Sequence, residues 1–202
     1  MKYTKTIGKS LIASLAIFCT LKLRSKKRKE FPMESKAKLF GHPIHPMLIV
    51  FPLGLFASAV IFDILYMSTG NLTLPTVSFY MIAAGVIGGL LAAIFGFIDW
   101  SGLPNNSRAK TIGGWHGIGN FVIVVLFAVS WILRRNNVDL VPDGLALILS
   151  FAGAGLALIT GWIGGELVYR LGVAVESRDP NAPNSLTDKS PAPPNVKRTS
   201  NR

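Results

Sequence analysis

The chain has 202 residues and a formal net charge of +11, yet only 15% of its residues are charged and half are hydrophobic. Soluble proteins carry about a quarter charged residues, so this composition excludes an ordinary soluble fold. The basic residues also match no recognised nucleic-acid-binding motif, which argues against nucleic acid as the partner.

Residues 1–38 form a basic segment around one short apolar run, Ser10–Leu21. The run has the length of a signal-peptide core, but no cleavage site of the Ala-x-Ala type follows it, and we predict that it is not cleaved. It is short for a membrane span, which leaves two interpretations open: an interfacial helix or an uncleaved anchor. Cys19 is interpreted as a small buried hydrophobic residue, because a single cysteine forms no internal disulfide.

Residues 39–175 contain long apolar blocks, each of roughly the 20 residues needed to cross a hydrocarbon core about 30 Å thick. The four blocks are Met47–Met67, Val77–Ile98, Gly113–Leu133 and Leu145–Val168. They lack the polar stripe of an amphipathic surface helix, and Met81–Ile98 carries no charge at all. The sequence therefore predicts an all-α integral membrane bundle of four transmembrane helices.

Residues 176–202 differ sharply from the apolar blocks. They are rich in proline, asparagine and serine and offer almost nothing to bury. Burial there cannot offset the entropy cost of ordering the chain, so we predict a disordered tail.

Lysines and arginines concentrate on one side of the alternating spans. They precede the first span, occur as Arg108 and Lys110 in the second connection and follow the fourth span, whereas Arg134 and Arg135 lie on the opposite side. The positive-inside tendency predicts a multi-pass plasma-membrane protein with both termini of the bundle in the cytoplasm. The lipid bilayer, including its anionic lipids, is then the partner of the basic residues.

Several polar side chains are predicted to meet at one end of the bundle, because the starts of spans one and three share a membrane face with the ends of spans two and four. They are His42, His45, Asp99, His116 and Glu166. Imidazolium near a helix N-terminus and carboxylate near a C-terminus each oppose the helix dipole, at about 0.3–1 kcal/mol. Such placement makes sense if these groups share a partner; the alternative is a purely structural polar cap.

Prolines define the local geometry of the first two histidines. Pro43 disfavours helix for His42, which predicts an extended approach, and Pro46 suits the first helical position, which places His45 at the cap. Pro52 is expected to open or kink the first span below the histidines.

Two ligand hypotheses follow. In the first, His42 or His45 acts with His116 as the axial pair of a haem b iron. In the second, all three histidines bind a transition-metal ion such as zinc, iron or copper with Asp99 or Glu166. Neither is a specific motif, and the chain has no c-type haem attachment site, dinucleotide fingerprint or phosphate loop. No nucleophile–base pair is evident, so enzymatic activity stays uncertain and is at most that of a redox component.

The segments GHPIHPMLIVFPLGL, GFIDW, WHGIGN and GWIGGELVYRLGVAVE, over about Phe40 to Val175, resemble the prokaryotic membrane family catalogued as domain of unknown function 2231. The resemblance implies a compact four-helix membrane domain. The family's recurrent polar positions fall on His42, His45, Asp99, His116, Gly165 and Glu166. Some relatives look to be joined to Rieske-type iron–sulfur domains, which implies that part of the family works with electron-transfer proteins. This chain has a single cysteine, so any redox partner would be a separate protein.

The sequence thus predicts a membrane protein that binds haem or a metal ion for electron transfer or redox sensing. Two alternatives stay open: a non-catalytic membrane subunit that docks a partner, and a small transporter or metal-handling protein. A transporter needs an ionisable path through the bilayer, and the spans offer little between Asp63 and the histidines. The sequence leaves homo-oligomerisation open.

Overall fold

The computed structural model describes residues 33–175. The interpretations of Ser10–Leu21, of Cys19 and of the tail over residues 176–202 lie outside the described residues.

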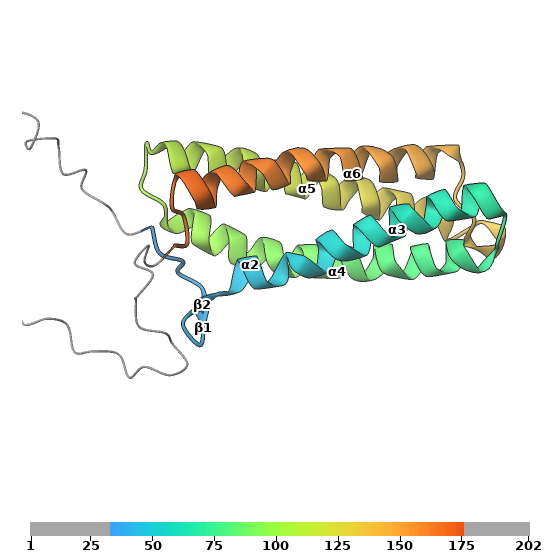
Figure 1. The fold of residues 1–202 in the computed structure, drawn as a ribbon, viewed down its shortest axis with the longest axis horizontal. Coiled ribbons are helices and arrows are strands. Elements are labelled where there is room, and N and C mark those ends of the chain that lie inside the picture. Colours follow the sequence, from blue (N-terminus) through green and yellow to red (C-terminus); the bar gives the residue numbers. More distant parts are fainter. Residues whose placement is uncertain (1–32, 176–202) are drawn as a thin grey trace, which may run out of the picture. The chain divides into compact units, whose positions relative to one another are not determined.

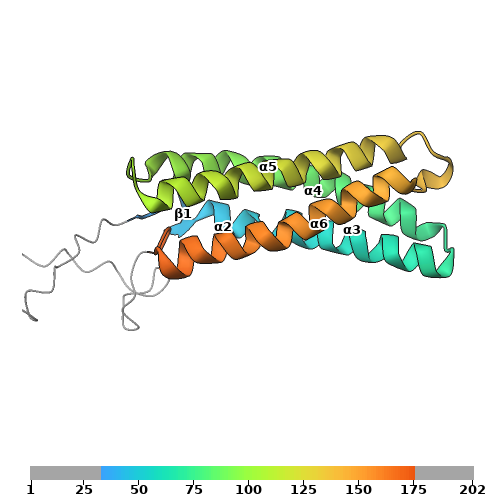
Figure 2. The same cartoon turned by 90° about the horizontal axis from the view of Figure 1, so that it is seen from above.

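Four helical spans, each long and apolar enough to cross a membrane, make up the described chain, as predicted (Figure 1). The first consists of α2 (Ile44–Leu48) and α3 (Val50–Thr69), the second is α4 (Thr73–Gly102), the third is α5 (Arg108–Arg134), and the fourth runs through η1 (Val138–Leu140), α6 (Gly144–Gly165) and η2 (Glu166–Arg170). Helix α3 packs beside α4 and α5 beside α6, so the bundle is built from two helical hairpins (Figures 1 and 2).

Large apolar side chains cover the outside of the bundle. Leu158 is 78% exposed and Phe97 66% exposed. A water-exposed surface of this kind would be unstable, whereas a bilayer solvates it, and helices satisfy their own backbone hydrogen bonds there. The protein is therefore an integral membrane protein in contact with the lipid bilayer.

A short β-hairpin precedes the first span. Strands β1 (Lys38–Leu39) and β2 (His42–Pro43) pair antiparallel, and the turn residues Phe40 and Gly41 both have positive φ, 50° and 83°, as in the tight turns that match strand twist. His42 is extended, as predicted. Pro46, however, is the third helical residue, because α2 begins at Ile44. Proline is tolerated there since N–H groups of the first helical turn have no intrahelical acceptor.

The first span opens where Pro52 was expected to open it. Proline has no N–H for the carbonyl of Leu48, and its ring crowds that carbonyl. Accordingly α2 ends at Leu48 and α3 starts at Val50. The two pieces remain one span, because Ile49 N–H donates to the His45 carbonyl at 3.1 Å.

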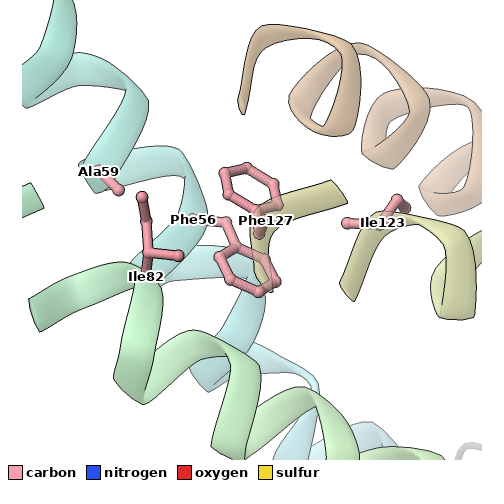
Figure 3. Close-up of a cluster of buried hydrophobic side chains, with 5 residues drawn as sticks. All are labelled: Phe56, Ala59, Ile82, Ile123 and Phe127. Carbon is pink, nitrogen blue, oxygen red and sulfur yellow. The ribbon is translucent and has the colours of Figure 1, made fainter. Parts of the chain in front are cut away.

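The centre of the bundle is an aromatic contact between the two hairpins. The rings of Phe56 and Phe127 stack with centroids 4.0 Å apart and an interplanar angle of 1°. Ala59, Ile82 and Ile123 complete this buried cluster (Figure 3).

A buried ion pair joins the hairpins nearer the end opposite to the histidines. Arg134 Nη1 and Nη2 donate to the two carboxylate oxygens of Asp63 at 2.7 and 2.6 Å, and both side chains have zero exposure. The remaining guanidinium donors reach the hydroxyls of Ser78, Ser130 and Ser150, at 3.0, 3.3 and 3.0 Å. All five donors of the guanidinium are thus used, and each of the four spans supplies a partner.

This ion pair corrects the expectation that Arg134 is a loop charge. Arg134 is the last residue of α5, and its side chain turns into the bundle rather than towards water. A charged side chain at membrane depth is costly unless it is paired, and Asp63 provides the opposite charge. Asp63 therefore has a definite structural partner.

Candidate functional site

His45 is fixed by a backbone carbonyl of the neighbouring helix. Its ring atom Nδ1 lies 2.8 Å from the carbonyl oxygen of Ala92 in α4. A carbonyl oxygen can only accept, so Nδ1 must carry the hydrogen, and in the neutral ring Nε2 keeps its lone pair. Among residues 33–175, nothing donates a hydrogen bond to that Nε2 atom.

His116 has the same arrangement in the second hairpin. Its Nδ1 atom lies 2.9 Å from the carbonyl oxygen of Thr160 in α6, which again defines Nδ1 as the donor. Here Nε2 accepts a hydrogen bond from the Asn120 amide at 3.1 Å, and the same amide donates to the His116 carbonyl at 2.8 Å.

Each imidazole lies directly against a glycine. A Cβ atom on Gly96 would be 2.8 Å from Cε1 of His45, and one on Gly164 would be 3.0 Å from Cε1 of His116. Real Cβ atoms do not approach ring atoms that closely. The two glycines therefore make room for the rings to reach the carbonyls of Ala92 and Thr160, each one helical turn earlier.

The two imidazoles come from different hairpins and lie at the same end of the bundle. His45 starts the first span, and His116 lies on the third. Neutral imidazoles with a free or displaceable Nε2 lone pair can ligate a metal ion, and a hydrogen bond from the other ring nitrogen to a backbone carbonyl is the usual support for such a ligand.

Asp99 lies at this end but serves the entry segment. Its Oδ1 atom accepts hydrogen bonds from the Ser35 hydroxyl at 2.8 Å and from the N–H groups of Lys36 and Ala37 at 2.9 and 3.1 Å. These contacts hold the chain against the bundle just before β1. The carboxylate thus has a structural task that does not involve the histidines.

The other predicted ligands are also apart from the imidazole pair. Glu166 forms an ion pair with Arg170 at 3.1 Å on its own helical turn, and His42 is exposed on β2. Within the described chain, no three His, Cys, Asp or Glu side chains are grouped so that they could hold a metal ion. Among the described residues, His42, Asp99 and Glu166 therefore do not join the two carbonyl-bound histidines in a metal-binding group.

His116 does not lie near a helix terminus, contrary to the prediction. Helix α5 begins at Arg108, earlier than predicted, because the Ser107 side chain caps it by accepting from Lys110 N–H at 3.0 Å. His116 is then in the third turn, beyond the reach of the helix-end charge. Its position is explained by Thr160 and Gly164 rather than by the dipole.

Several residues of the site carry no signal that the sequence prediction used. Asn120 could have been found, because it lies four residues after His116 and such residues are neighbours on one helix face. The acceptors on Ala92 and Thr160 are backbone atoms, so their residue types reveal nothing.

A pocket of about 650 Å³ opens beside the α4–α5 connection at the same end. Its lining includes Trp100, Asn105, Lys110 and Trp115. Lys110 Nζ donates to the carbonyls of Trp100 and Ser101 at 2.9 and 3.2 Å and lies 4.3 Å from the Trp100 ring centroid, so it caps the end of α4.

Comparison with protein families gives one match that covers residues 41–177, to the family described as "Predicted membrane protein (DUF2231)". The match includes all four spans and both carbonyl-bound histidines. Comparisons with curated proteins and with solved structures returned no match.

Proposed function

The chain belongs to the family of predicted membrane proteins called domain of unknown function 2231, and on that premise we propose that His45 and His116 hold a metal centre, with haem b as the best fit, for electron transfer. One observation carries the proposal. Both imidazoles donate from Nδ1 to a backbone carbonyl, at 2.8 and 2.9 Å, which leaves Nε2 as the ligating atom of each ring.

The number of grouped ligands favours haem over a bare metal ion. Haem b needs at most two axial imidazoles, and the site offers two. A zinc ion needs four ligands, of which at least three come from the protein. The described residues offer no such third donor beside the histidine pair.

The protein's own residues perform three tasks in this proposal. The carbonyls of Ala92 and Thr160 orient the rings and make Nε2 more electron-rich. Gly96 and Gly164 keep the rings in place by close packing. The apolar spans would lower the polarity around a bound group, which tunes a redox potential. Haem, when bound, supplies reversible one-electron transfer, and a separate redox protein would exchange the electron.

The distribution of basic residues supports a plasma-membrane protein whose histidine end faces the cytoplasm. Lys36, Lys38 and Arg108 lie at that end. At the other end Arg134 is neutralised by Asp63, which weakens the opposing charge. A green fluorescent protein fused after residue 202 should fluoresce, since it folds to its fluorescent form in the cytoplasm; loss of fluorescence with normal protein amounts contradicts this orientation.

Visible absorption of the detergent-purified protein, expressed with haem precursor, tests the function. We expect sharp reduced bands of six-coordinate haem in the wild type. His45→Ala and His116→Ala should lose them, whereas the matched control His42→Ala should keep them, because His42 lies outside the carbonyl-bound pair. A featureless wild-type spectrum after haem supplementation refutes haem binding.

A second candidate function, docking of a partner protein by a non-catalytic subunit, is favoured by the pocket at the α4–α5 connection. Exposed Trp115 and the neighbouring Asn105 and Asn106 form a surface that combines aromatic and hydrogen-bonding groups. Trp115→Ala should then release a co-purifying partner without any change in the spectrum. An unchanged set of co-purifying proteins removes this candidate.

A further inference from the structure

The two hairpins carry matching residues at matching positions. His45 and His116, Phe56 and Phe127, and Asp63 and Arg134 are all separated by the same 71 residues. The match extends to the neighbouring helices. His45 binds a carbonyl 47 residues later in the chain, and His116 binds a carbonyl 44 residues later. The three-residue difference arises between Asp63 and Ser78 in the first hairpin and between Arg134 and Ala146 in the second.

Contacts inside each hairpin repeat as well. Gly85 lies against the ring of Phe56, where a Cβ would be 2.6 Å from Cε1, and Gly153 lies against the ring of Phe127, where it would be 2.8 Å from Cε2. The two glycines precede the two carbonyl acceptors, Ala92 and Thr160, by the same number of residues. Helix packing is therefore in the same register in both hairpins.

A crossing serine hydroxyl is a further repeated contact. Ser78 donates to the carbonyl of Ala59 at 3.2 Å in the first hairpin, and Ser130 donates to the carbonyl of Ala146 at 2.7 Å in the second. These two contacts join equivalent positions, although the serine is on the second helix in one case and on the first helix in the other.

Equivalent residues also meet one another between the hairpins. Phe56 stacks on Phe127, and Asp63 pairs with Arg134. The same repeat puts His45 and His116 at equivalent positions of the end that they share. Contact of a residue with its own counterpart is the signature of a two-fold axis. Because both hairpins run in the same direction, the axis lies along the membrane normal, as in other proteins with parallel internal repeats.

Asn120 breaks this symmetry at the histidines. Its amide donates to Nε2 of His116 at 3.1 Å, while the equivalent position in the first hairpin is Ile49, which has no hydrogen-bonding side chain. Both residues follow their histidine by four positions, so an asparagine at either place can reach the ring one turn before it. The Nε2 atom of His45 consequently lacks the bond that holds the Nε2 atom of His116.

We propose that His45 and His116 are equivalent halves of one two-fold ligand site, and that Asn120 makes the site one-sided by holding Nε2 of His116. A ligand then bonds first to His45 and must displace the Asn120 amide before it reaches His116. Asn120 is a positioning residue, because it acts through His116. The displaced amide keeps its bond to the His116 carbonyl, at 2.8 Å, so little structure is lost.

Exchange of the two equivalent residues tests the proposal without any ligand. Full-length protein with ¹⁵N-labelled histidine in detergent micelles reports the state of each Nε2 atom by NMR, and His42→Ala identifies the third histidine. In Asn120→Ile the Nε2 resonance of His116 should move to that of His45, and in Ile49→Asn the His45 resonance should move to that of His116. If Asn120→Ile, folded as judged by the other resonances, leaves His116 unchanged, the proposal is overturned.

A titration with ferric haem b extends the test, and this part rests on the proposed function. Loss of one competing hydrogen bond should tighten binding by about five- to tenfold in Asn120→Ile, and Ile49→Asn should weaken it by a similar factor. The double variant should bind like the wild type. Equal affinities of all four proteins overturn the role of Asn120 in ligand binding. No binding by any of them refutes the proposed function, while the NMR result still decides the symmetry.

Discussion

The two ends of the bundle use polar residues in opposite ways. Nearer one end, Asp63 and Arg134 are fully buried and every donor of the guanidinium has a partner. At the other end, His45 and His116 each donate from Nδ1 to a backbone carbonyl, and although Nε2 of His116 accepts from Asn120, no residue among 33–175 donates to Nε2 of His45. Because all hydrogen-bond donors of Arg134 have partners, the first end is a structural ion-pair site. Because Nε2 of His45 has no hydrogen-bond donor among residues 33–175, the second end can bind a ligand.

Removal of the Asp63–Arg134 ion pair should have the largest effect on stability. Arg134→Ala leaves the carboxylate of Asp63 buried without its partner, which should cost about 3–5 kcal/mol of unfolding free energy. Unfolding by dodecyl sulfate in mixed micelles measures this loss. Arg135→Ala is the matched control, because Arg135 lies only in a loose contact 5.9 Å from the Trp131 ring centroid. Equal stability of the two variants would show that the ion pair does not lock the bundle.

Crowding the aromatic centre should have the next largest effect. Gly85→Ala places a Cβ 2.6 Å from Phe56, whose ring cannot retreat because it is stacked on Phe127. We expect a loss of about 1–3 kcal/mol. Gly153→Ala should lose a similar amount, whereas Gly155→Ala, with open space at its Cβ, should not. The same unfolding assay compares them, and a strong difference between Gly85→Ala and Gly153→Ala would contradict the repeated packing.

Changes at the histidine end should affect ligation more than stability. Gly96→Ala pushes the ring of His45 away from the Ala92 carbonyl, and the lost hydrogen bond should cost about 0.5–1.5 kcal/mol. The visible spectrum and the NMR resonance of His45 should both change. Gly117→Ala, on the same end with nothing within 4 Å of its Cβ, is the control. A normal spectrum and an unmoved resonance in Gly96→Ala would mean that the carbonyl does not orient His45.

The smallest global effect is expected from Asp99. Asp99→Ala frees the entry segment at Ser35–Ala37, which lies before the first span, so the bundle should lose less than about 1 kcal/mol. Limited proteolysis should cut this segment faster, while the visible spectrum stays as in the wild type. Loss of the haem bands in this variant would instead return Asp99 to the ligand site.

The sequence predicts the four spans because hydropathy is a local signal. It predicts the shared end of the histidines because successive spans alternate in direction across the membrane. Asp63 and Arg134 carry no local signal of their contact, since 71 residues separate them. Arg134 therefore resembles a loop charge when it is considered with Arg135 alone. The repeat was visible in principle, because His45 precedes Phe56 by the same interval as His116 precedes Phe127.

The remaining errors came from the ends of elements. The start of α5 depends on the Ser107 side chain, which extends the helix beyond the apolar block used for prediction. That extension removed His116 from the first turn and with it one argument for a dipole effect. Asp99 and Glu166 were placed at the correct end, but their contacts with Ser35–Ala37 and Arg170 depend on side-chain geometry.

The buried ion pair also bears on how the protein is made. Arg134 follows Asp63 by 71 residues, so a chain that ends before the third span leaves Asp63 without its partner. An aspartate at the centre of a span costs about 2.5–3.5 kcal/mol on insertion scales, and less near the interface. Arrival of the third span cancels this penalty, so correct assembly is favoured over any nascent chain that stops early. A truncated chain keeps an exposed charge in the bilayer, which distinguishes it physically from the finished protein.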